Sequence, residues 1–450
     1  MMGRQAEPEQ LFYRFRLEDH VPQDHLLRRI DWLLDLNSLR GELAFLYSPI
    51  GRPSIDPELL IRMLLVGYLY GIRSETRLCQ EVHLNLAYRW FCRLGLEGRV
   101  PDRSSFSKNR HGRFAEGAVM RRLFETVVER CAAWGFVGGT AAAVDGSTVA
   151  ADANRDRRAS PEDVRKVWST EETVARPVRA YLDQLEAEAA TLRDGPRDGP
   201  EHKAPTTISE TDPQAAWSTK DGPGRFSYET NYLVDTDHGI IVDVEATPAR
   251  LSQEIVAAKA MLARSARRHG FQPSSLAADG SYGTGPFLAW LLSLGIAPHV
   301  PVLDRRHQTK GKLDQSHFGY DPKRDVYTCL EGHELRHRKT DPARRIKSYR
   351  GDKATCGACP IHKACTDAEA RTVVRHMDEE ARQAARDLAH TPAFAESRHK
   401  RKKVEMLFAH LKRHLGLTRL RLRGLAGATE EFLLAATVQN LKRLTKLAHA

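Results

Sequence analysis

The feature that most constrains the fold is a change in hydrophobic pattern at Gly139. Residues 140–151 are small and apolar on both faces, which is typical of a strand buried in the middle of a sheet. Further along, strands predicted on either side of Asp237-His238-Gly239 form a hairpin, and later strands alternate with helices. The predicted strands are 226–235, 240–247, 275–282 (ending in a Gly-rich turn) and 298–302, and the helices between them are 252–269 and 286–294. This alternation predicts an α/β domain.

The residues before this change predict an all-α N-terminal domain, 1–135. Asp56-Pro57 gives one helix a capping acid followed by a proline at its first position. The later segment 104–114 is basic and includes Arg110. Short helices followed by a basic segment are compatible with a helix-turn-helix-like DNA-binding module. An ordinary helical bundle with a solvated basic face explains the pattern equally well.

The densest run of cations lies near the C-terminus, from Arg401 to Lys412. Val404, Phe408 and Leu411 form an apolar stripe at helical spacing. Glu405 lies beside that stripe, so an acid that can hold a divalent cation is surrounded by bases that can hold a polyanion. The whole chain of 450 residues has 69 Lys and Arg against 58 Asp and Glu, a net charge of +11. This balance favours nucleic acid as the partner, although a basic surface kept for solubility is the alternative.

Two further acids interrupt apolar strands. Asp145 lies within the buried strand 140–151, and Asp279 follows an apolar strand directly before Gly280. Buried acids are costly unless they are paired or bind a cation. With Glu405 they make three carboxylates able to hold two Mg²⁺ ions about 3.5–4 Å apart. Taken singly, each acid is better explained as a turn residue or, for Glu405, as the partner of Arg401; their order along the chain favours the joint interpretation.

Residues 303–395 are polar, basic and rich in turns, and they hold four of the seven cysteines. No N-terminal export signal and no membrane span is predicted, so the thiols should be reduced in a cytosol. A metal is then a better explanation for the cluster than disulfides, and we favour one tetrahedral structural Zn²⁺. Four reduced thiols without metal are the alternative. The cluster consists of Cys329, Cys356, Cys359 and Cys365.

Several motifs together resemble the DDE transposases of bacterial insertion sequences. In that family the last acid lies in the pattern Tyr-x2-Arg-x3-Glu-x6-Lys, and Arg401, Glu405 and Lys412 match it, with Arg398 in the Tyr position. Segments 144–147 and 278–282 are similar to the family's first and second acid motifs, with Ser281 in place of the usual Gly. Residues 51–57, 85–91 and 100–104 are similar to a helical domain common in the family.

The resemblance implies an RNase H-like catalytic core with Asp145, Asp279 and Glu405 as ligands of two Mg²⁺ ions, with Mn²⁺ as a substitute. It implies hydrolysis at the ends of a DNA element and transfer of the freed 3′-hydroxyl into target DNA. The partners would be the element's terminal inverted repeats and target DNA, bound by a homodimer at the bacterial nucleoid in the cytoplasm, without a membrane. The residues expected to contact DNA are Arg401, Lys412, Arg398, Lys402 and Arg110.

The implied organisation has four parts. They are a helical DNA-binding domain (1–135), a first part of the core (136–302, with a charged insertion at 155–210), the cysteine-containing insertion (303–395) and the C-terminal helices of the core (396–450). A nuclease of the same fold without strand transfer, or a catalytically silent regulator derived from a transposase, remains an alternative function.

Overall fold

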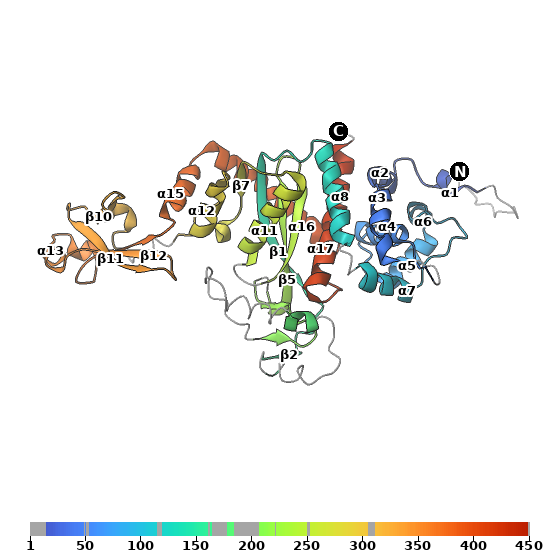
Figure 1. Ribbon diagram of the computed structural model, residues 1–450, viewed down its shortest axis with the longest axis horizontal. Coiled ribbons are helices and arrows are strands. Elements are labelled where there is room, and N and C mark those ends of the chain that lie inside the picture. The colour runs from blue at the N-terminus through green and yellow to red at the C-terminus, as the bar shows by residue number, and fades with distance from the viewer. Residues whose placement is uncertain are drawn as a thin grey trace, which may run out of the picture. The chain divides into compact units, whose positions relative to one another are not determined.

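The computed structural model (Figure 1) describes residues 15–48, 50, 54–114, 119–160, 163, 178–183, 207–220, 222–249, 253–304 and 311–448. Most of the charged insertion expected at 155–210 lies outside these residues. The chain divides into two compact units. Unit 1 comprises residues 1–133, 409–420 and 426–450, and unit 2 comprises residues 134–408 and 421–425.

Unit 1 is helical, as its sequence predicts. Asp56 accepts a hydrogen bond from the amide of Glu58 and so caps α4, which is buried along almost its whole length. Asn85 ends α5 and caps α6 by accepting a hydrogen bond from the amide of Tyr88. The helices are α1 (Leu17–His20), α2 (Leu26–Leu33), α3 (Asn37–Glu42), α4 (Pro57–Leu69), α5 (Glu75–Leu84), α6 (Leu86–Phe91), α7 (Arg103–Asn109), a π-helical turn (Arg110–Phe114), α8 (Val119–Ala133) and most of α17 (Gly424–Leu447).

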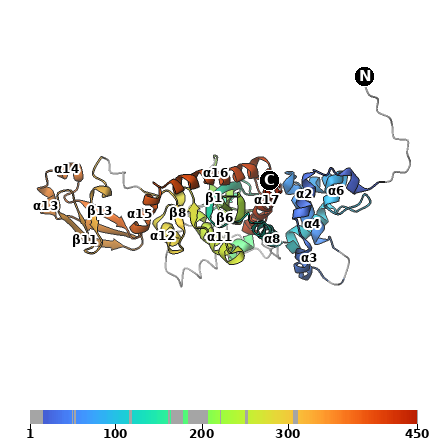
Figure 2. The ribbon, with the colours of Figure 1, turned by 90° about the horizontal axis from the view of Figure 1, so that it is seen from above.

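Unit 2 is built on a six-stranded mixed sheet with the strand order β4-β5-β1-β7-β8, and β6 also pairs with β5. Three of its strands, β1, β6 and β8, are labelled in Figure 2. The central strand β1 runs antiparallel to β5 and parallel to β7, and β7 runs parallel to β8. The strands are β1 (Ala141–Ala150), β4 (Ala216–Ser218), β5 (Arg225–Asp235), β6 (Ile240–Pro248), β7 (Ser275–Ala277) and β8 (Ala297–His299).

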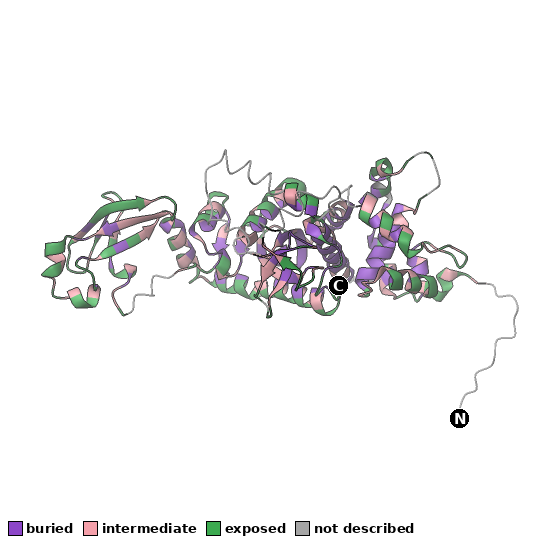
Figure 3. Cartoon of the chain, turned by 90° about the horizontal axis from the view of Figure 1, so that it is seen from below, coloured by how far each residue is buried: buried purple, intermediate pink, exposed green. Residues whose placement is uncertain are grey.

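Helices join and cover this sheet. Helix α11 (Gln253–His269) connects β6 to β7 and packs on β6, and α12 (Gly285–Ser293) connects β7 to β8. Later in the chain come α15 (Glu379–Leu388) and α16 (Pro392–Arg413). Every residue of β5 after Arg225 is buried, in keeping with a central strand covered on both faces. Figure 3 draws buried residues in purple, and the central strands of unit 2 carry many of them. No helix among the described residues is long and apolar enough to span a membrane.

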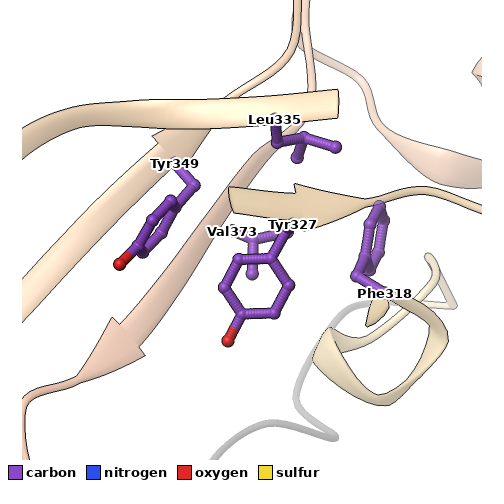
Figure 4. Close-up of a cluster of buried hydrophobic side chains, with 5 residues drawn as sticks. All are labelled: Phe318, Tyr327, Leu335, Tyr349 and Val373. Atoms are coloured by element: carbon purple, nitrogen blue, oxygen red, sulfur yellow. The ribbon is translucent and has the colours of Figure 1, made fainter. Parts of the chain in front are cut away.

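The segment that the sequence describes only as polar and turn-rich forms a second, five-stranded antiparallel sheet. Its order is β13-β12-β11-β10-β9. Five side chains form its apolar core (Figure 4): Phe318, Tyr327, Leu335, Tyr349 and Val373. The elements are β9 (Gly319–Asp321), β10 (Val326–Thr328), β11 (Glu334–Asp341), β12 (Ile346–Arg350) and β13 (Thr372–His376), with the short helices α13 (Lys353–Gly357) and α14 (His362–Cys365) between β12 and β13.

Candidate active site

The pairing of β1 with β7 brings two acids together. Ala143 lies opposite Ala277 in this parallel pair, and Asp145 and Asp279 each follow two residues later. Both acids leave the same end of this strand pair, and they lie near enough for the carboxylate of Asp279 to raise the pKa of Asp145. Asp279 also caps a 3-10 turn (Gly280–Tyr282), accepting a hydrogen bond of 2.8 Å from the amide of Ser281.

Glu405 reaches the same place from helix α16. The apolar stripe predicted on this helix is buried, and the ring of Phe408 stacks on Tyr232 of β5 with 4.8 Å between ring centroids. The guanidinium of Arg401 then joins two acids: Nη1 lies 3.0 Å from Asp145 Oδ2, and Nη2 lies 2.9 Å from Glu405 Oε1. One cation therefore bridges the first and the third of the predicted acids.

Two lysines of α16 fix the helix beside the sheet. Lys400 forms an ion pair of 2.7 Å with Asp237, in the turn between β5 and β6. Lys403 donates hydrogen bonds to the main-chain carbonyls of Thr236 and Asp237 at 2.6 and 3.0 Å. These contacts hold the face of α16 that carries Arg401 against the end of β5.

The electrostatics of Asp145 reflect a concentration of negative charge. The pKa of Asp145 is raised to about 6, chiefly by burial and also by the nearby carboxylates of Asp279 and Glu254. The amide of Gly146 and the guanidinium of Arg401 act in the opposite direction. A second cation at this point would relieve the same repulsion.

Two acids that the sequence analysis does not single out lie beside this group. Glu229 on β5 is buried, and Glu254 is at the start of α11. Lys220 pairs with both, at 3.1 Å from Glu229 and 2.9 Å from Glu254. Neither acid stands out in the sequence, because Glu229 lies among the polar residues Ser227, Thr230 and Asn231, and Glu254 is an acid in the first turn of a helix.

The glycine after Asp145 leaves room for Glu229. A β-carbon added at Gly146 would lie 3.1 Å from the side-chain carbons Cγ and Cδ of Glu229 and 3.0 Å from Asn231 Oδ1. These separations are tight, so a side chain at position 146 would displace its neighbours on β5.

The expected DNA-contact residues fall into different environments. Arg398 and Lys402 are exposed on α16, and Lys412 is half-buried two turns after Glu405 on the same helix. Arg110 is buried within unit 1, where its guanidinium lies 3.1 Å from the carboxylate of Glu75. That guanidinium is thus committed to an internal ion pair.

Among the described residues, no three His, Cys, Asp or Glu side chains are arranged to hold a metal ion as they stand. The guanidinium of Arg401 lies between two of the three predicted acids, Asp145 and Glu405. The donor set still fits a hard divalent cation, because it consists of carboxylate oxygens that repel one another around a partly buried strand.

The four cysteines of the insertion line one pocket beside the five-stranded sheet, together with His333 and His362. Burial raises the pKa of Cys365, and the other three thiols add to this while Arg371 opposes it. The thiols are therefore close enough to influence one another, although they are not in ligating geometry. The pocket members are Cys329 after β10, Cys356 on α13, Cys359, and Cys365 at the end of α14.

Comparison with known proteins gives two family matches. Residues 15–112 match the family described as "Transposase domain (DUF772)", and residues 328–445 match the family described as "Transposase DDE domain". No curated protein sequence matches the chain.

One solved structure that is similar is a piggyBac transposase in a synaptic complex with hairpin DNA. The two chains are 9% identical, with a TM-score of 0.34, over 93% of this chain and 72% of the other. A similarity at this level carries no structural argument.

The two matched domains lie in the order that the sequence motifs predict, the first over the helical N-terminal region and the second across the segment that contains Arg401, Glu405 and Lys412. The chain therefore contains two transposase domains, and together they support a DDE transposase of an insertion sequence.

Proposed function

We propose that this DNA transposase hydrolyses phosphodiester bonds at the ends of its element and joins the freed 3′-hydroxyl to target DNA. The observation that carries the proposal is that the guanidinium of Arg401 joins Asp145 to Glu405 while the carboxylate of Asp279 lies near enough to Asp145 to raise its pKa. The order of the six-stranded sheet supports an RNase H-like core. On one side of β1, β5 runs antiparallel to β1 and β6 runs antiparallel to β5; on the other side, β7 and β8 run parallel to β1.

Each acid has a distinct setting for this chemistry. Asp145, Asp279 and Glu405 would hold Mg²⁺, with Mn²⁺ as a substitute, and two such ions supply activation of the attacking oxygen and stabilisation of the leaving oxygen. Asp145 is fixed by its strand, Asp279 by the turn that it caps, and Glu405 by a helix anchored at Lys400 and Lys403.

Arg401 links the acids to the DNA. Its guanidinium now pairs with Asp145 and Glu405, and the same planar fork matches a phosphate group. Contact with DNA phosphate requires this guanidinium to release the carboxylates. Arg398, Lys402 and Lys412 on α16 extend the cationic surface along the helix, whereas the buried Arg110 is left out of this surface because Glu75 neutralises it.

The decisive experiment uses the purified protein, Mg²⁺ and a plasmid that carries the gene with its flanking DNA. Joined products support transposition, nicks without joining support a nuclease of the same fold, and binding alone supports a silent regulator. Glu405→Gln should abolish cleavage and leave DNA binding nearly intact, because it removes a ligand and no phosphate contact. Glu396→Gln on the same helix, where the carboxylate is 66% exposed and pairs with Lys400, is the matched control. Cleavage by Glu405→Gln at the wild-type rate would remove Glu405 from the site.

The phosphate contacts have their own test. Arg401→Ala and Lys412→Ala should each weaken binding to end DNA and reduce the slope of log affinity against log salt by about 0.9 for each phosphate that the variant no longer neutralises. An unchanged slope would show that the mutated side chain does not touch phosphate.

We also propose a structural Zn²⁺ at Cys329, Cys356, Cys359 and Cys365. A small domain with little core gains its stability from such an ion, and the core of the five-stranded sheet has five buried residues. Binding would require the thiols to close in from their present separation in the pocket.

The proposed assembly is a homodimer that holds the two element ends together. Sedimentation of the protein with and without end DNA tests this: a complex of two chains with two DNA ends is expected, and a complex of a single chain with a single end at all concentrations would contradict it.

A further inference from the structure

The acid at position 279 is linked by hydrogen bonds to an acid on another element. The hydroxyl of Ser281 lies 2.5 Å from Asp279 Oδ1 and 2.9 Å from Glu254 Oε2. The other oxygen of Glu254 lies 2.9 Å from Lys220 Nζ, which also reaches Glu229 at 3.1 Å. A continuous polar chain thus runs from Asp279 through Ser281, Glu254 and Lys220 to Glu229.

Each link in this chain comes from a different part of unit 2. Ser281 belongs to the turn after β7, Glu254 to the first turn of α11, Lys220 to the segment between β4 and β5, and Glu229 to β5. Glu229 in turn lies against Gly146, the neighbour of Asp145. This hydrogen-bonded network therefore connects the turn that carries Asp279 to the neighbourhood of Asp145 on β1.

Asp279 needs such support because its own setting is open. It follows the end of β7 at a half-buried position, and its Oδ1 accepts hydrogen bonds only from the amide and hydroxyl of Ser281 among the contacts of the described residues. A ligand carboxylate has to be held within about 0.5 Å of its working position. The hydroxyl of Ser281 can supply this restraint only if it is itself fixed, and Glu254 fixes it.

We propose that Ser281 and Glu254 are positioning residues that hold the Asp279 carboxylate for divalent-cation binding. The inference rests on the proposed function, since it assumes that Asp279 is a ligand, and it adds two residues that the DDE motif does not contain. Position 281 is where this chain has Ser in place of the usual Gly, so the device belongs to this chain in particular.

The proton count of the network identifies the informative variant. A serine hydroxyl has one proton, so it can donate to Asp279 or to Glu254 but not to both. A glutamine at position 254 can donate its amide N–H to the Ser281 oxygen and still accept from Lys220. Glu254→Gln should therefore keep the positioning, whereas Glu254→Ala should lose it. A residue acting through its negative charge or as a direct ligand would fail in both variants.

The experiment measures cleavage of the plasmid carrying the gene and its flanking DNA across a Mg²⁺ titration. Ser281→Ala and Glu254→Ala should each raise the Mg²⁺ concentration for half-maximal cleavage by about 10-fold. Loss of a hydrogen-bond partner of a metal ligand typically weakens metal binding by about 10- to 100-fold, and we expect the smaller effect here. The double variant should be no worse than the worse single variant, because both changes break one path. Glu254→Gln should stay within about twofold of the wild type, a free-energy change below ~0.5 kcal/mol.

Three results would overturn the inference: an unchanged Mg²⁺ curve for either alanine variant, additive effects in the double variant, or a Glu254→Gln defect equal to that of Glu254→Ala. Ser281→Gly, which restores the usual residue, gives a second variant should Ser281→Ala fold poorly, and it should show the same shift. Ser293→Ala and Glu380→Ala, at exposed positions on or near α12 and α15, are the controls. Binding of end DNA in EDTA verifies that each variant is folded.

The two levels of the proposal fail differently. If the wild-type protein does not cleave in Mg²⁺, the proposed function fails. If it cleaves and Ser281→Ala has the wild-type Mg²⁺ curve, only the positioning role fails.

Discussion

The six-stranded and five-stranded sheets of unit 2 differ in how they use their residues. In the first, β5 is buried from Phe226 to Asp235. In the second, Leu335 is the one buried residue of β11, and the rest of that strand is polar and partly or fully exposed. A charged residue in the first sheet therefore needs a compensating partner, while a charged residue in the second is solvated at little cost. An acidic residue therefore indicates a functional site only where it lies in the buried six-stranded sheet.

This difference also explains which parts of the structure are predictable. The strands expected at 226–235 and 240–247 are observed at Arg225–Asp235 and Ile240–Pro248, because both are rich in aromatic and β-branched residues and flank the turn Asp237-His238-Gly239. The sequence Glu-Leu-Arg-His-Arg-Lys-Thr-Asp of β11 has no such pattern. Its pairing depends on main-chain hydrogen bonds to β10 and β12, which leave no trace in residue type.

The candidate site divides in the same way. Asp145 and Asp279 can be selected from the sequence because each breaks an apolar strand, and Glu405 because of the motif around it. An ion pair with Arg401 one helical turn away is the simpler explanation of Glu405, and this pair is present in the structure. The same guanidinium also contacts Asp145, which the sequence does not indicate. Lys220 and Glu254 could not be found, because their contacts join segments far apart in the chain.

The largest expected effect contrasts an acid of each sheet. Asp145→Asn should reduce cleavage on the order of 10³-fold or more, as expected for loss of a group that acts as part of one catalytic unit. Asp341→Asn at the end of β11, where the carboxylate accepts a bond from the amide of Arg344, should leave cleavage unchanged. Rates of plasmid cleavage in Mg²⁺ compare the two. Equal losses would remove the distinction between the sheets.

The next effect concerns the source of stability of the five-stranded sheet. Elemental analysis should find about one zinc per chain. Cys356→Ser should remove it and, because a structural zinc contributes on the order of 10 kcal/mol, expose the amides of β10, β11 and β12 to hydrogen exchange. Cys79→Ser in unit 1 should keep the zinc. A wild-type protein free of zinc with a fully protected second sheet would refute the site.

A tyrosine in each core separates global from local stability. Tyr232→Ala should lower the free energy of unfolding of unit 2 by about 3–5 kcal/mol, because it leaves a cavity beside Phe408. Tyr349→Ala should increase hydrogen exchange in β11 and β12 while the amides of β1 and β5 stay protected. The Tyr→Phe variants keep the ring and serve as controls. Simultaneous loss of protection in both sheets would show that they unfold as one.

The smallest effect involves a buried acid beside the first sheet that is not a candidate ligand. Asp212 is fully buried and accepts a hydrogen bond of 2.6 Å from the hydroxyl of Tyr228. Burial raises its pKa to about 6, opposed by that hydroxyl and by the amide of Gly424. Its folded-state pKa lies above the ordinary value, so its favourable contribution is complete below about pH 4 and is lost as the pH rises through about 6.

Asp212→Asn keeps an oxygen for Tyr228 without the buried charge. It should raise the free energy of unfolding on the order of 1–3 kcal/mol at pH 7.5 and by almost nothing near pH 4. Denaturant unfolding at the two pH values measures the difference. A destabilised variant at pH 7.5 would mean that the Asp212 charge is compensated in the folded state.

Asp145 and Asp279 each follow, by two residues, one of the paired residues Ala143 and Ala277. This equal spacing limits how the gene can vary. Substitutions around the two acids change their surroundings by degrees, but inserting or deleting one codon between Ala143 and Asp145 would turn that carboxylate to the opposite side of the sheet. Length is therefore constrained more tightly here than composition. A graft of this segment into another transposase should succeed only if the number of residues is kept.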